Sequence, residues 1–316
     1  MSTTLPSADA PLKIGTRGSP LALAQAYETR KRLMAAHGLP DDAFEISIIK
    51  TTGDRVLDRP LKEIGGKGLF TREIEDDLLS GAIDIAVHSM KDMPTIQPDG
   101  LVLTTYLPRE DVRDAFVCLN DYTLATLPKG AKVGSSSLRR RAQLLNYRSD
   151  LEVVEFRGNV QTRLKKLQDE VAACTFLAMA GLNRLAMDDV PKTAIAPEDM
   201  LPAVAQGAIG IECREDDAAT HALLAAIHHK ETGERLAAER AFLKTLDGSC
   251  ETPIAALAES DGDTLRLRGE ILRPDGSERL ADEISGPIAD GAALGATLGE
   301  RLLGRAAPGF FDWRAA

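Results

Sequence analysis

The chain has 316 residues, a length that predicts two or three domains. Hydrophobic residues make up 44% and charged residues 27% of it, which is ordinary for a globular protein with substantial apolar cores. The formal net charge of −10 argues against broad nucleic-acid binding. It also means that an anionic ligand requires cations clustered at one place.

The cysteines and the first residues indicate where the protein works. We expect no disulfide framework and no metal site, because the four cysteines are scattered without a CxxC pair or a zinc-ligand spacing. They are Cys118, Cys174, Cys213 and Cys250. Residues 1–10 lack the features of a secretory signal and are expected to form a disordered leader. No later run is long enough to span a membrane, so we expect a cytoplasmic protein.

Arg17 stands in the first of several strand–loop–helix units. Residues 12–15 predict a strand and residues 21–36 a helix, with Ser19 as its N-cap and Pro20 at its first position. Arg17 lies in the loop between them, where the unpaired N–H groups and the dipole of the helix already favour an anion.

A glycine-rich stretch at residues 64–70 precedes a helix expected at about residues 71–79, after a strand at residues 45–50. Such a stretch suggests phosphate binding, but a nucleotide P-loop needs Ser or Thr after its lysine, and Gly68 follows Lys67 here. A loop that covers a ligand and a plain flexible turn remain as alternatives.

Residues 83–87 predict a short buried strand that ends in a polar loop. Loops at the carboxyl ends of strands project functional side chains from a rigid base. A lysine next to an aspartate can bind an anion and handle a proton, although a solvated loop is the alternative reading. The polar residues are His88, Ser89, Lys91 and Asp92.

The strand–loop–helix pattern with arginine then recurs twice. Arg139 and Arg140 open a helix predicted at residues 138–147, after a strand at 132–134 and a run of serines that includes Ser137. Arg141 follows them, but three consecutive residues fan out around a helix and cannot all face one site.

The second recurrence places Arg157 after a strand at residues 151–156 and Arg163 in the first turn of a helix at 160–168, capped by Asn159. Three such units predict a cleft lined with arginines for carboxylate or phosphate groups.

The rest of the chain contains two predicted crossings and a change of character. Arg109–Asp111 marks the first crossing, and Pro191, Pro197 and Pro202 mark irregular chain at the second. Predicted strands cover residues 101–106, 115–119, 176–180 and 208–212, with Arg184 after the third; predicted helices cover 221–229 and 234–246. Strands at 253–259, 264–272 and 278–285 and a helix at 290–303 then indicate a small α+β domain.

Cys250 lies in a tight loop before this last domain. A single cysteine in a cytosolic protein is usually a small buried hydrophobe. A cysteine nucleophile needs a partner that lowers its pKa, commonly histidine, and none is near Cys250 in the sequence. The residues therefore do not indicate a cysteine hydrolase.

Seven blocks in the same order closely resemble the porphobilinogen deaminase (hydroxymethylbilane synthase) family over nearly the whole chain. They are Thr16-Arg-Gly-Ser-Pro-Leu-Ala22, Gly65-Gly-Lys-Gly-Leu-Phe70, Val87-His-Ser-Met-Lys-Asp92, Gly134-Ser-Ser-Ser-Leu-Arg-Arg140, Arg157-Gly-Asn-Val-Gln-Thr-Arg163, Gly210-Ile-Glu212 and Gly248-Ser-Cys250.

The resemblance implies an α/β fold with two doubly wound solute-binding-protein-like domains and a small C-terminal α+β domain with an antiparallel sheet. The implied domains are residues 11–107 with 205–227, residues 108–204, and residues 228–316, which include the cofactor cysteine. The strand near Ala208 is expected to rejoin the first domain.

The resemblance further implies a monomeric transferase that condenses four porphobilinogen molecules head to tail into linear hydroxymethylbilane, releasing four ammonia molecules, in haem biosynthesis. Asp92 matches the catalytic acid, and Cys250 matches the cysteine that holds a dipyrromethane cofactor through a thioether. A carboxylate near the pyrrole nitrogens can assist loss of the ammonium group and stabilise the azafulvene cation that results.

Further positions match residues that bind the acetate and propionate groups of the cofactor and the growing chain, and Gly65, Gly66, Lys67 and Gly68 match a mobile loop. The ligand-binding positions are Arg17, Ser89, Lys91, Ser137, Arg139, Arg140, Arg157, Arg163 and Arg184. One departure is Glu63, where the family usually has lysine, and Lys62 is one residue away.

Two other classes of function compete with this one. A non-catalytic protein whose two α/β lobes close on an organic anion explains the arginines but needs neither Asp92 nor Cys250. Nucleic-acid binding through Arg139–Arg141 conflicts with the net charge and with an aromatic content of 4%, too low for base stacking.

Overall fold

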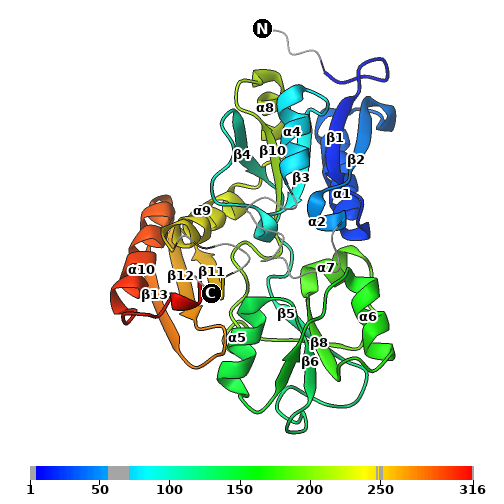
Figure 1. The fold of residues 1–316 in the computed structure, drawn as a ribbon. Helices are drawn as coiled ribbons and strands as arrows, with labels where there is room; N and C mark the ends of the chain where they lie inside the picture. Colours follow the sequence, from blue (N-terminus) through cyan, green and yellow to red (C-terminus); the bar gives the residue numbers. More distant parts are fainter. Residues whose placement is uncertain (1–4, 56–70, 247, 249–251, 315–316) are drawn as a thin grey trace. The chain divides into compact units, whose positions relative to one another are not determined.

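The computed structural model describes residues 5–55, 71–246, 248 and 252–314. The chain forms two compact units (Figure 1). The first comprises Met1–Glu110 and Ala208–Gly233, and the second comprises Asp111–Gly207 and Glu234–Ala316. The glycine-rich stretch, Lys62, Glu63 and Cys250 lie outside the described residues.

The first unit contains a mixed five-stranded sheet in the order β2-β1-β3-β10-β4. Its main elements are β1 (Leu12–Arg17), α1 (Pro20–His37), β2 (Phe44–Ile49), α2 (Thr52–Arg55), α4 (Arg72–Ser80), β3 (Ile85–Ser89), β4 (Leu101–Tyr106), β10 (Ile209–Arg214) and α8 (Ala218–Ala225), with 3-10 turns η1 (Asp41–Ala43) and η2 (Met90–Asp92). Strand β1 is parallel to β2 and β3, whereas β10 is antiparallel to β3 and β4. The predicted return of the chain into the first half is thus confirmed.

Helices cover both faces of this sheet because its strands are apolar on both sides. Along β3, Ile85 and Val87 join the core that contains residues of α1 and α8, while Ala86 joins the core that contains Ile74 and Leu78 of α4. Successive residues of a strand point to opposite faces, so one strand supplies both cores. The expected doubly wound arrangement is confirmed here.

The second unit begins with a sheet of the same type, in the order β7-β6-β8-β5-β9. Its elements are β5 (Asp114–Cys118), β6 (Lys132–Gly134), α5 (Leu138–Tyr147), β7 (Glu152–Val154), α6 (Val160–Gln168), β8 (Cys174–Ala178), α7 (Met179–Arg184) and β9 (Lys192–Ala194). Leu144 of α5 packs on one face, and Leu167 of α6 and Leu182 of α7 pack on the other. The second doubly wound half is therefore also confirmed.

Several elements differ from the sequence prediction, among them α2, which was not predicted, and α9, which begins four residues early. Three further differences have a local cause. Strand β9 lies in the stretch that was predicted to be irregular because of its prolines. A short strand at the edge of the sheet, paired with β5, can form between prolines. Helix α7 replaces the predicted strand end, and Ala178 gives it no side-chain cap that would have signalled its start. Helix α8 begins earlier than expected because the carboxylate of Asp217 accepts a hydrogen bond from the Thr220 N–H (3.0 Å).

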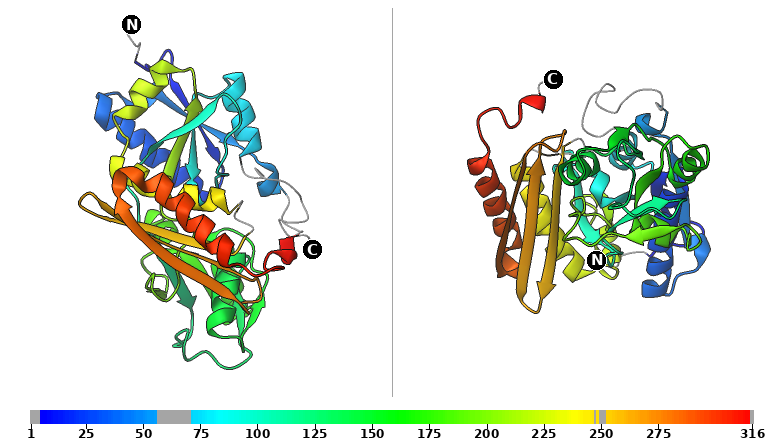
Figure 2. Two further views of the ribbon diagram at one scale, coloured as in Figure 1. Left: turned by 90° about the vertical axis from the view of Figure 1, so that its left-hand side faces the viewer. Right: turned by 90° about the horizontal axis from the view of Figure 1, so that it is seen from below.

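The C-terminal part of the second unit is a three-stranded antiparallel sheet with two helices on one face (Figure 2). It comprises α9 (Lys230–Thr245), which starts in the first unit, β11 (Ile254–Asp261), β12 (Thr264–Leu272), β13 (Arg279–Pro287), the 3-10 turn η3 (Ile288–Asp290), α10 (Gly291–Arg305) and the 3-10 turn η4 (Asp312–Arg314). Phe242 of α9 and Leu298 of α10 both lie where a side chain at Gly269 of β12 would project. The predicted α+β part is confirmed.

The opposite face of this sheet packs on other segments of the second unit. Ala255 and Leu257 of β11 form an apolar cluster with Leu201, and the Ala256 N–H donates to the Pro202 carbonyl (3.2 Å). In the described part of the chain, no helix has both the length and the apolar character needed to cross a membrane.

Candidate active site

A pocket of about 70 Å³ in the first unit brings three predicted site residues together. Arg17 ends β1 and Ser89 ends β3, and these strands are parallel, so their carboxyl ends lie at one edge of the sheet. Asp92 follows in the short turn η2. The pocket is lined by these three residues with Ser19, Leu21, Ala22, Gln25, Thr71, Val87, His88 and Met93.

The start of α1 is fixed as the sequence predicts. The Ser19 hydroxyl accepts a hydrogen bond from the Ala22 N–H (3.3 Å), and Pro20 occupies the first turn. The helix therefore begins three residues after Arg17, which ends β1, and this fixes the position of the Arg17 backbone.

Gln25 is a pocket residue that the sequence analysis missed. The Ser89 hydroxyl lies 2.8 Å from Gln25 Nε2, from which it accepts, and 3.0 Å from Gln25 Oε1, to which it donates. Gln25 lies on the buried face of α1 together with Ala22, Ala26 and Leu33. A long polar side chain at helical spacing within a stripe of mostly small or apolar residues was the signal that could have found it.

Asp92 is half-buried, and no hydrogen bond or ion pair joins its carboxylate to another of the residues that the structure describes. Lys91 stands beside it in η2 and is also half-buried, but it does not line the pocket. Asp92 therefore presents an acceptor to whatever enters the pocket.

The pocket residue His88 is paired with a buried carboxylate, Glu212. His88 Nε2 lies 3.0 Å from Glu212 Oε2, and Glu212 on β10 is fully buried. Burial, reinforced by the nearby charge of Glu212, raises the pKa of Glu75 on α4, although contacts with Thr71 and His88 oppose the shift. The pair joins β3 to its antiparallel neighbour where the functional loop begins.

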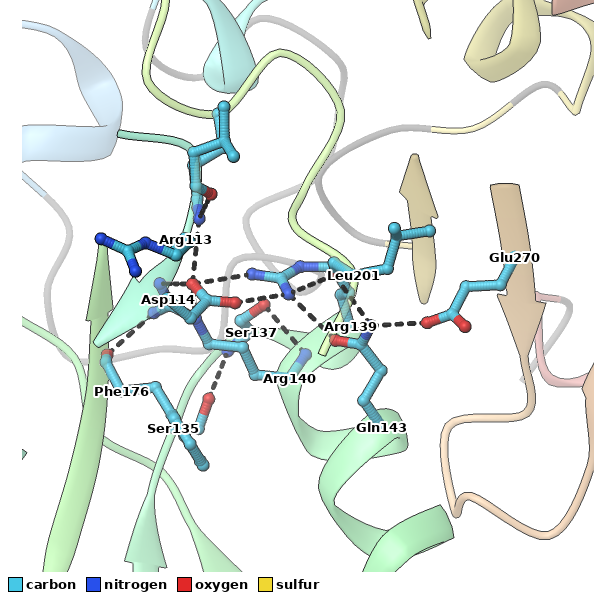
Figure 3. A network of polar contacts seen from close by, with 12 residues as sticks. Arg113, Asp114, Ser135, Ser137, Arg139, Arg140, Gln143, Phe176, Leu201 and Glu270 are labelled. Carbon is cyan, nitrogen blue, oxygen red and sulfur yellow. Dashed lines mark hydrogen bonds and ion pairs between the residues drawn. The ribbon is translucent and has the colours of Figure 1, made fainter. Parts of the chain in front are cut away.

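In the second unit, Arg139 and Arg140 converge on Asp114 (Figure 3). Arg139 Nη1 lies 2.7 Å from Asp114 Oδ2, and Arg140 Nη2 lies 2.7 Å from Oδ1. Burial favours the neutral carboxyl, but the two guanidiniums outweigh it and hold the pKa of Asp114 well below its usual range. One carboxylate between two guanidiniums leaves a surplus of positive charge.

Both guanidiniums are more enclosed than the sequence suggested, with exposures of 4% and 5%. Arg140 Nη1 also donates to the Phe176 carbonyl (2.8 Å), and Arg139 Nη1 to the Leu201 carbonyl (3.0 Å). Arg139 Nε is buried and, within the described residues, has no hydrogen-bond partner. The surplus charge and this unsatisfied donor suit an anionic group such as a carboxylate.

Other predicted positions of the second unit are placed as follows. The Ser137 hydroxyl caps α5 by accepting from the Arg140 N–H (3.4 Å), and Arg141 is exposed, as expected from the fan of consecutive residues. Arg163 Nε donates to the Gly158 carbonyl (2.9 Å). Arg184 Nη2 donates to the Gly207 carbonyl (3.0 Å).

Arg157 lies in the connection between β7 and α6 and is half-buried. Asn159 caps α6 as predicted, because its side-chain oxygen accepts from the Thr162 N–H (2.9 Å). The structure therefore forms two clusters of predicted site residues, one around Asp92 and one around Asp114.

Family models and a curated relative match this chain to the same family. The model of the porphobilinogen deaminase dipyromethane cofactor binding domain matches residues 12–222, and that of the porphobilinogen deaminase C-terminal domain matches residues 234–304. The chain is 70% identical over 311 residues to the porphobilinogen deaminase of Paracoccus denitrificans (strain Pd 1222), covering 98% of this chain and 99% of that one.

Solved structures of binding proteins are distantly similar. A periplasmic binding protein of Salmonella typhimurium is 16% identical, with a TM-score of 0.41, covering 69% of this chain and 91% of that one. The GluR0 ligand-binding core from Nostoc punctiforme, solved with L-glutamate, is 12% identical, with a TM-score of 0.38, covering 69% and 91% respectively.

Proposed function

Because this chain belongs to the porphobilinogen deaminase family, it is a hydroxymethylbilane synthase, and we propose that Asp92 is its catalytic acid and Cys250 holds its dipyrromethane cofactor. The enzyme is a transferase of tetrapyrrole biosynthesis. It condenses four porphobilinogen molecules head to tail into linear hydroxymethylbilane with release of four ammonia molecules.

The observation that carries the role of Asp92 is its place in the pocket. Its carboxylate lines the same pocket as Arg17 and Ser89, and it forms no hydrogen bond or ion pair with another of the described residues. A proton is needed when the substrate's amino group leaves as ammonia, and the substrate carbon that loses it becomes cationic. A carboxylic acid supplies the proton, and the carboxylate that remains stabilises the cation.

Cys250 is proposed as the attachment point because the motif Gly248-Ser-Cys250 matches the block that holds the cofactor cysteine in the family. Its sulfur forms a bond to the methylene carbon of one porphobilinogen unit, whose carbon–nitrogen bond breaks. The thiol proton and the amino group leave together as ammonia. When bound, the cofactor supplies the pyrrole carbon onto which the chain is built.

We propose that the predicted cationic and hydroxyl residues bind the acetate and propionate groups of cofactor and chain. The surplus charge around Asp114 and the unsatisfied Arg139 Nε support this role in the second unit. Guanidiniums suit carboxylates because two N–H groups can donate in parallel. The proposed set is Arg17, Ser89, Lys91, Ser137, Arg139, Arg140, Arg157, Arg163 and Arg184.

We also propose that the enzyme is a cytoplasmic monomer that does not bind nucleic acid. The thiols of Cys118, Cys174 and Cys213 are buried and unpaired in the described structure, which suits a reducing compartment. The net charge of −10 disfavours binding to a polyanion. Light scattering is expected to give a mass near 33.9 kDa; a mass of two chains contradicts the monomer.

Replacing Arg139 with leucine tests the anion role. Asp114 keeps Arg140 as a partner, so we expect a folded variant with more apo-protein or a KM for porphobilinogen raised roughly tenfold. Intact mass, initial rates and thermal unfolding measure these effects. Arg141→Leu is the matched control, since Arg141 is exposed in the same turn. Normal assembly and normal KM in Arg139→Leu remove this arginine from ligand binding.

A further inference from the structure

The side chain of Gln143 connects the arginine pair to the C-terminal sheet within the second unit (Figure 3). Its Oε1 accepts a hydrogen bond from Arg139 Nη1 (2.9 Å). Its Nε2 donates to Glu270 Oε1 on β12 (2.5 Å) and to the Leu201 carbonyl (2.8 Å). Gln143 is 8% exposed and Glu270 is 1% exposed, so water does not offer replacement partners.

Glu270 determines which way the amide of Gln143 points. A carboxylate and a carbonyl only accept, so the NH₂ group must face Glu270 and Leu201, and the amide oxygen then faces Arg139. In the opposite orientation, the NH₂ group of Gln143 would face the N–H groups of Arg139. Its oxygen would face the Glu270 carboxylate and the Leu201 carbonyl, which have no proton to donate. Glu270 therefore acts on Arg139 through Gln143.

The position of Glu270 ties this orientation to the strand that follows Cys250. Glu270 lies opposite Ala255 in the pairing of β12 with β11, and β11 begins at Ile254. The second oxygen of Glu270 accepts from Arg279 Nε on β13 (2.6 Å), which fixes the carboxylate. The bridge thus runs from β12, which pairs with the first strand after Cys250, to the guanidinium of Arg139.

A second contact keeps α5 against the same sheet. Asn146 Nδ2 donates to the Gly276 carbonyl (2.9 Å) in the turn between β12 and β13. Gly276 has φ +73°, and a Cβ atom there would come within 2.5 Å of the backbone nitrogen of Asn146. This turn therefore requires glycine. The helix is held independently of Glu270, and loss of the carboxylate changes the orientation of Gln143 more than the place of the helix.

We infer that Glu270 and Gln143 are positioning residues, which hold the Arg139 guanidinium in the orientation that receives a ligand carboxylate. This inference rests on the proposed role of Arg139. Bound carboxylates meet Arg139 in both the ground and the transition state, so a misplaced guanidinium raises KM more than it lowers kcat.

The test compares two substitutions of Glu270 in the holoenzyme. Glu270→Leu removes the acceptor, and we expect KM for porphobilinogen to rise roughly tenfold with kcat within about twofold. Glu270→Gln retains an oxygen that accepts from Gln143, and its NH₂ group then faces Arg279, whose exposed side chain can turn to water. We therefore expect a KM close to that of the wild type. Glu283→Gln is the matched control, since Glu283 is an exposed carboxylate paired with Arg266 in the same sheet.

The outcomes separate this inference from the proposed function. A raised KM in Arg139→Leu with a normal KM in Glu270→Leu overturns the inference alone, as does a Gln variant as impaired as the Leu variant. Normal KM and normal cofactor assembly in both Arg139→Leu and Glu270→Leu overturn the ligand role of Arg139 and the inference with it. A purely structural role lowers the unfolding temperature without changing KM.

Gln143→Met provides a second route if Glu270→Leu does not fold. Methionine keeps much of the shape, but it has no donor for Glu270 and offers Arg139 only a weakly accepting sulfur in place of the amide oxygen. We expect the same roughly tenfold rise in KM. An unchanged KM in a folded, cofactor-loaded Gln143→Met protein contradicts the inference.

Discussion

Replacing Asp92 with asparagine is expected to leave the cofactor attached and to reduce turnover by about 10²- to 10⁴-fold. The amide has nearly the shape of the carboxylic acid but neither donates a proton to departing ammonia nor carries the charge that stabilises a cation. Since the Asp92 carboxylate has no partner among the described residues, its loss breaks no internal ion pair there. Stability should therefore be nearly unchanged.

Single-turnover ammonia release, intact mass and thermal unfolding measure the three parts of this prediction. Asp99→Asn is a suitable control, because Asp99 is an exposed carboxylate seven positions along the same connection. Ammonia release at the wild-type rate by Asp92→Asn removes Asp92 from the mechanism. Loss of the attached cofactor assigns it to assembly instead.

Replacing Asp114 with asparagine is expected to lower the free energy of unfolding by about 3–5 kcal/mol. Two buried guanidiniums then lose the one carboxylate between them, and an amide cannot neutralise either. Denaturant unfolding of apo-protein measures the loss. Asp111→Asn is the control: Asp111 pairs with the partly exposed Arg113, and such pairs contribute at most about 1 kcal/mol. Equal effects of the two substitutions contradict the importance of the buried cluster.

The same carboxylate predicts a pH dependence. Because the pKa of Asp114 is lower in the folded protein than in the unfolded chain, its contribution to stability is complete above about pH 4 and is lost as pH falls below that. Wild-type stability should therefore fall more steeply than that of Asp114→Asn in acid. Parallel curves below pH 4 would show that the cluster does not lower this pKa.

The sequence predicts most of the scaffold because its signals are local. Ser19 and Asn159 each cap the helix that their position predicted, and Ser137 at the end of the serine run caps the helix that follows it. Each accepts a backbone hydrogen bond. The recurring unit of strand and capped helix is therefore present three times. Its arginines lie at the strand end (Arg17), in the first helical turn (Arg139, Arg140) or in the connection (Arg157). The strand ends differ by a few residues, since the last turns and pairs depend on neighbours elsewhere in the chain.

The partners of the arginines were not predictable in this way. Arg139 and Arg140 meet Asp114 across 25 and 26 positions, and Gln143 meets Glu270 across 127. Only the sheet order and the packing of the C-terminal strands bring these residues together. Asp114 at the start of a strand otherwise made of apolar residues was the one local sign of a buried charge.

Asp92 shows the intermediate case. Its position after a buried strand indicated a functional loop, and the pocket with Arg17 and Ser89 agrees with that prediction. Neither the strand nor the pocket distinguishes a catalytic acid from a binding residue. That assignment comes from the family resemblance, and the asparagine variant tests it.

The most direct test of the account is the intact mass of the purified protein, followed by the masses of its peptides. We predict an added mass of two linked pyrrole units, located on the peptide that contains Cys250, while the peptide with Cys118 stays unmodified. A purified apo-protein should gain the same adduct on incubation with porphobilinogen. A Cys250 peptide that remains unmodified after that incubation, or an adduct on another residue, contradicts the proposed attachment point.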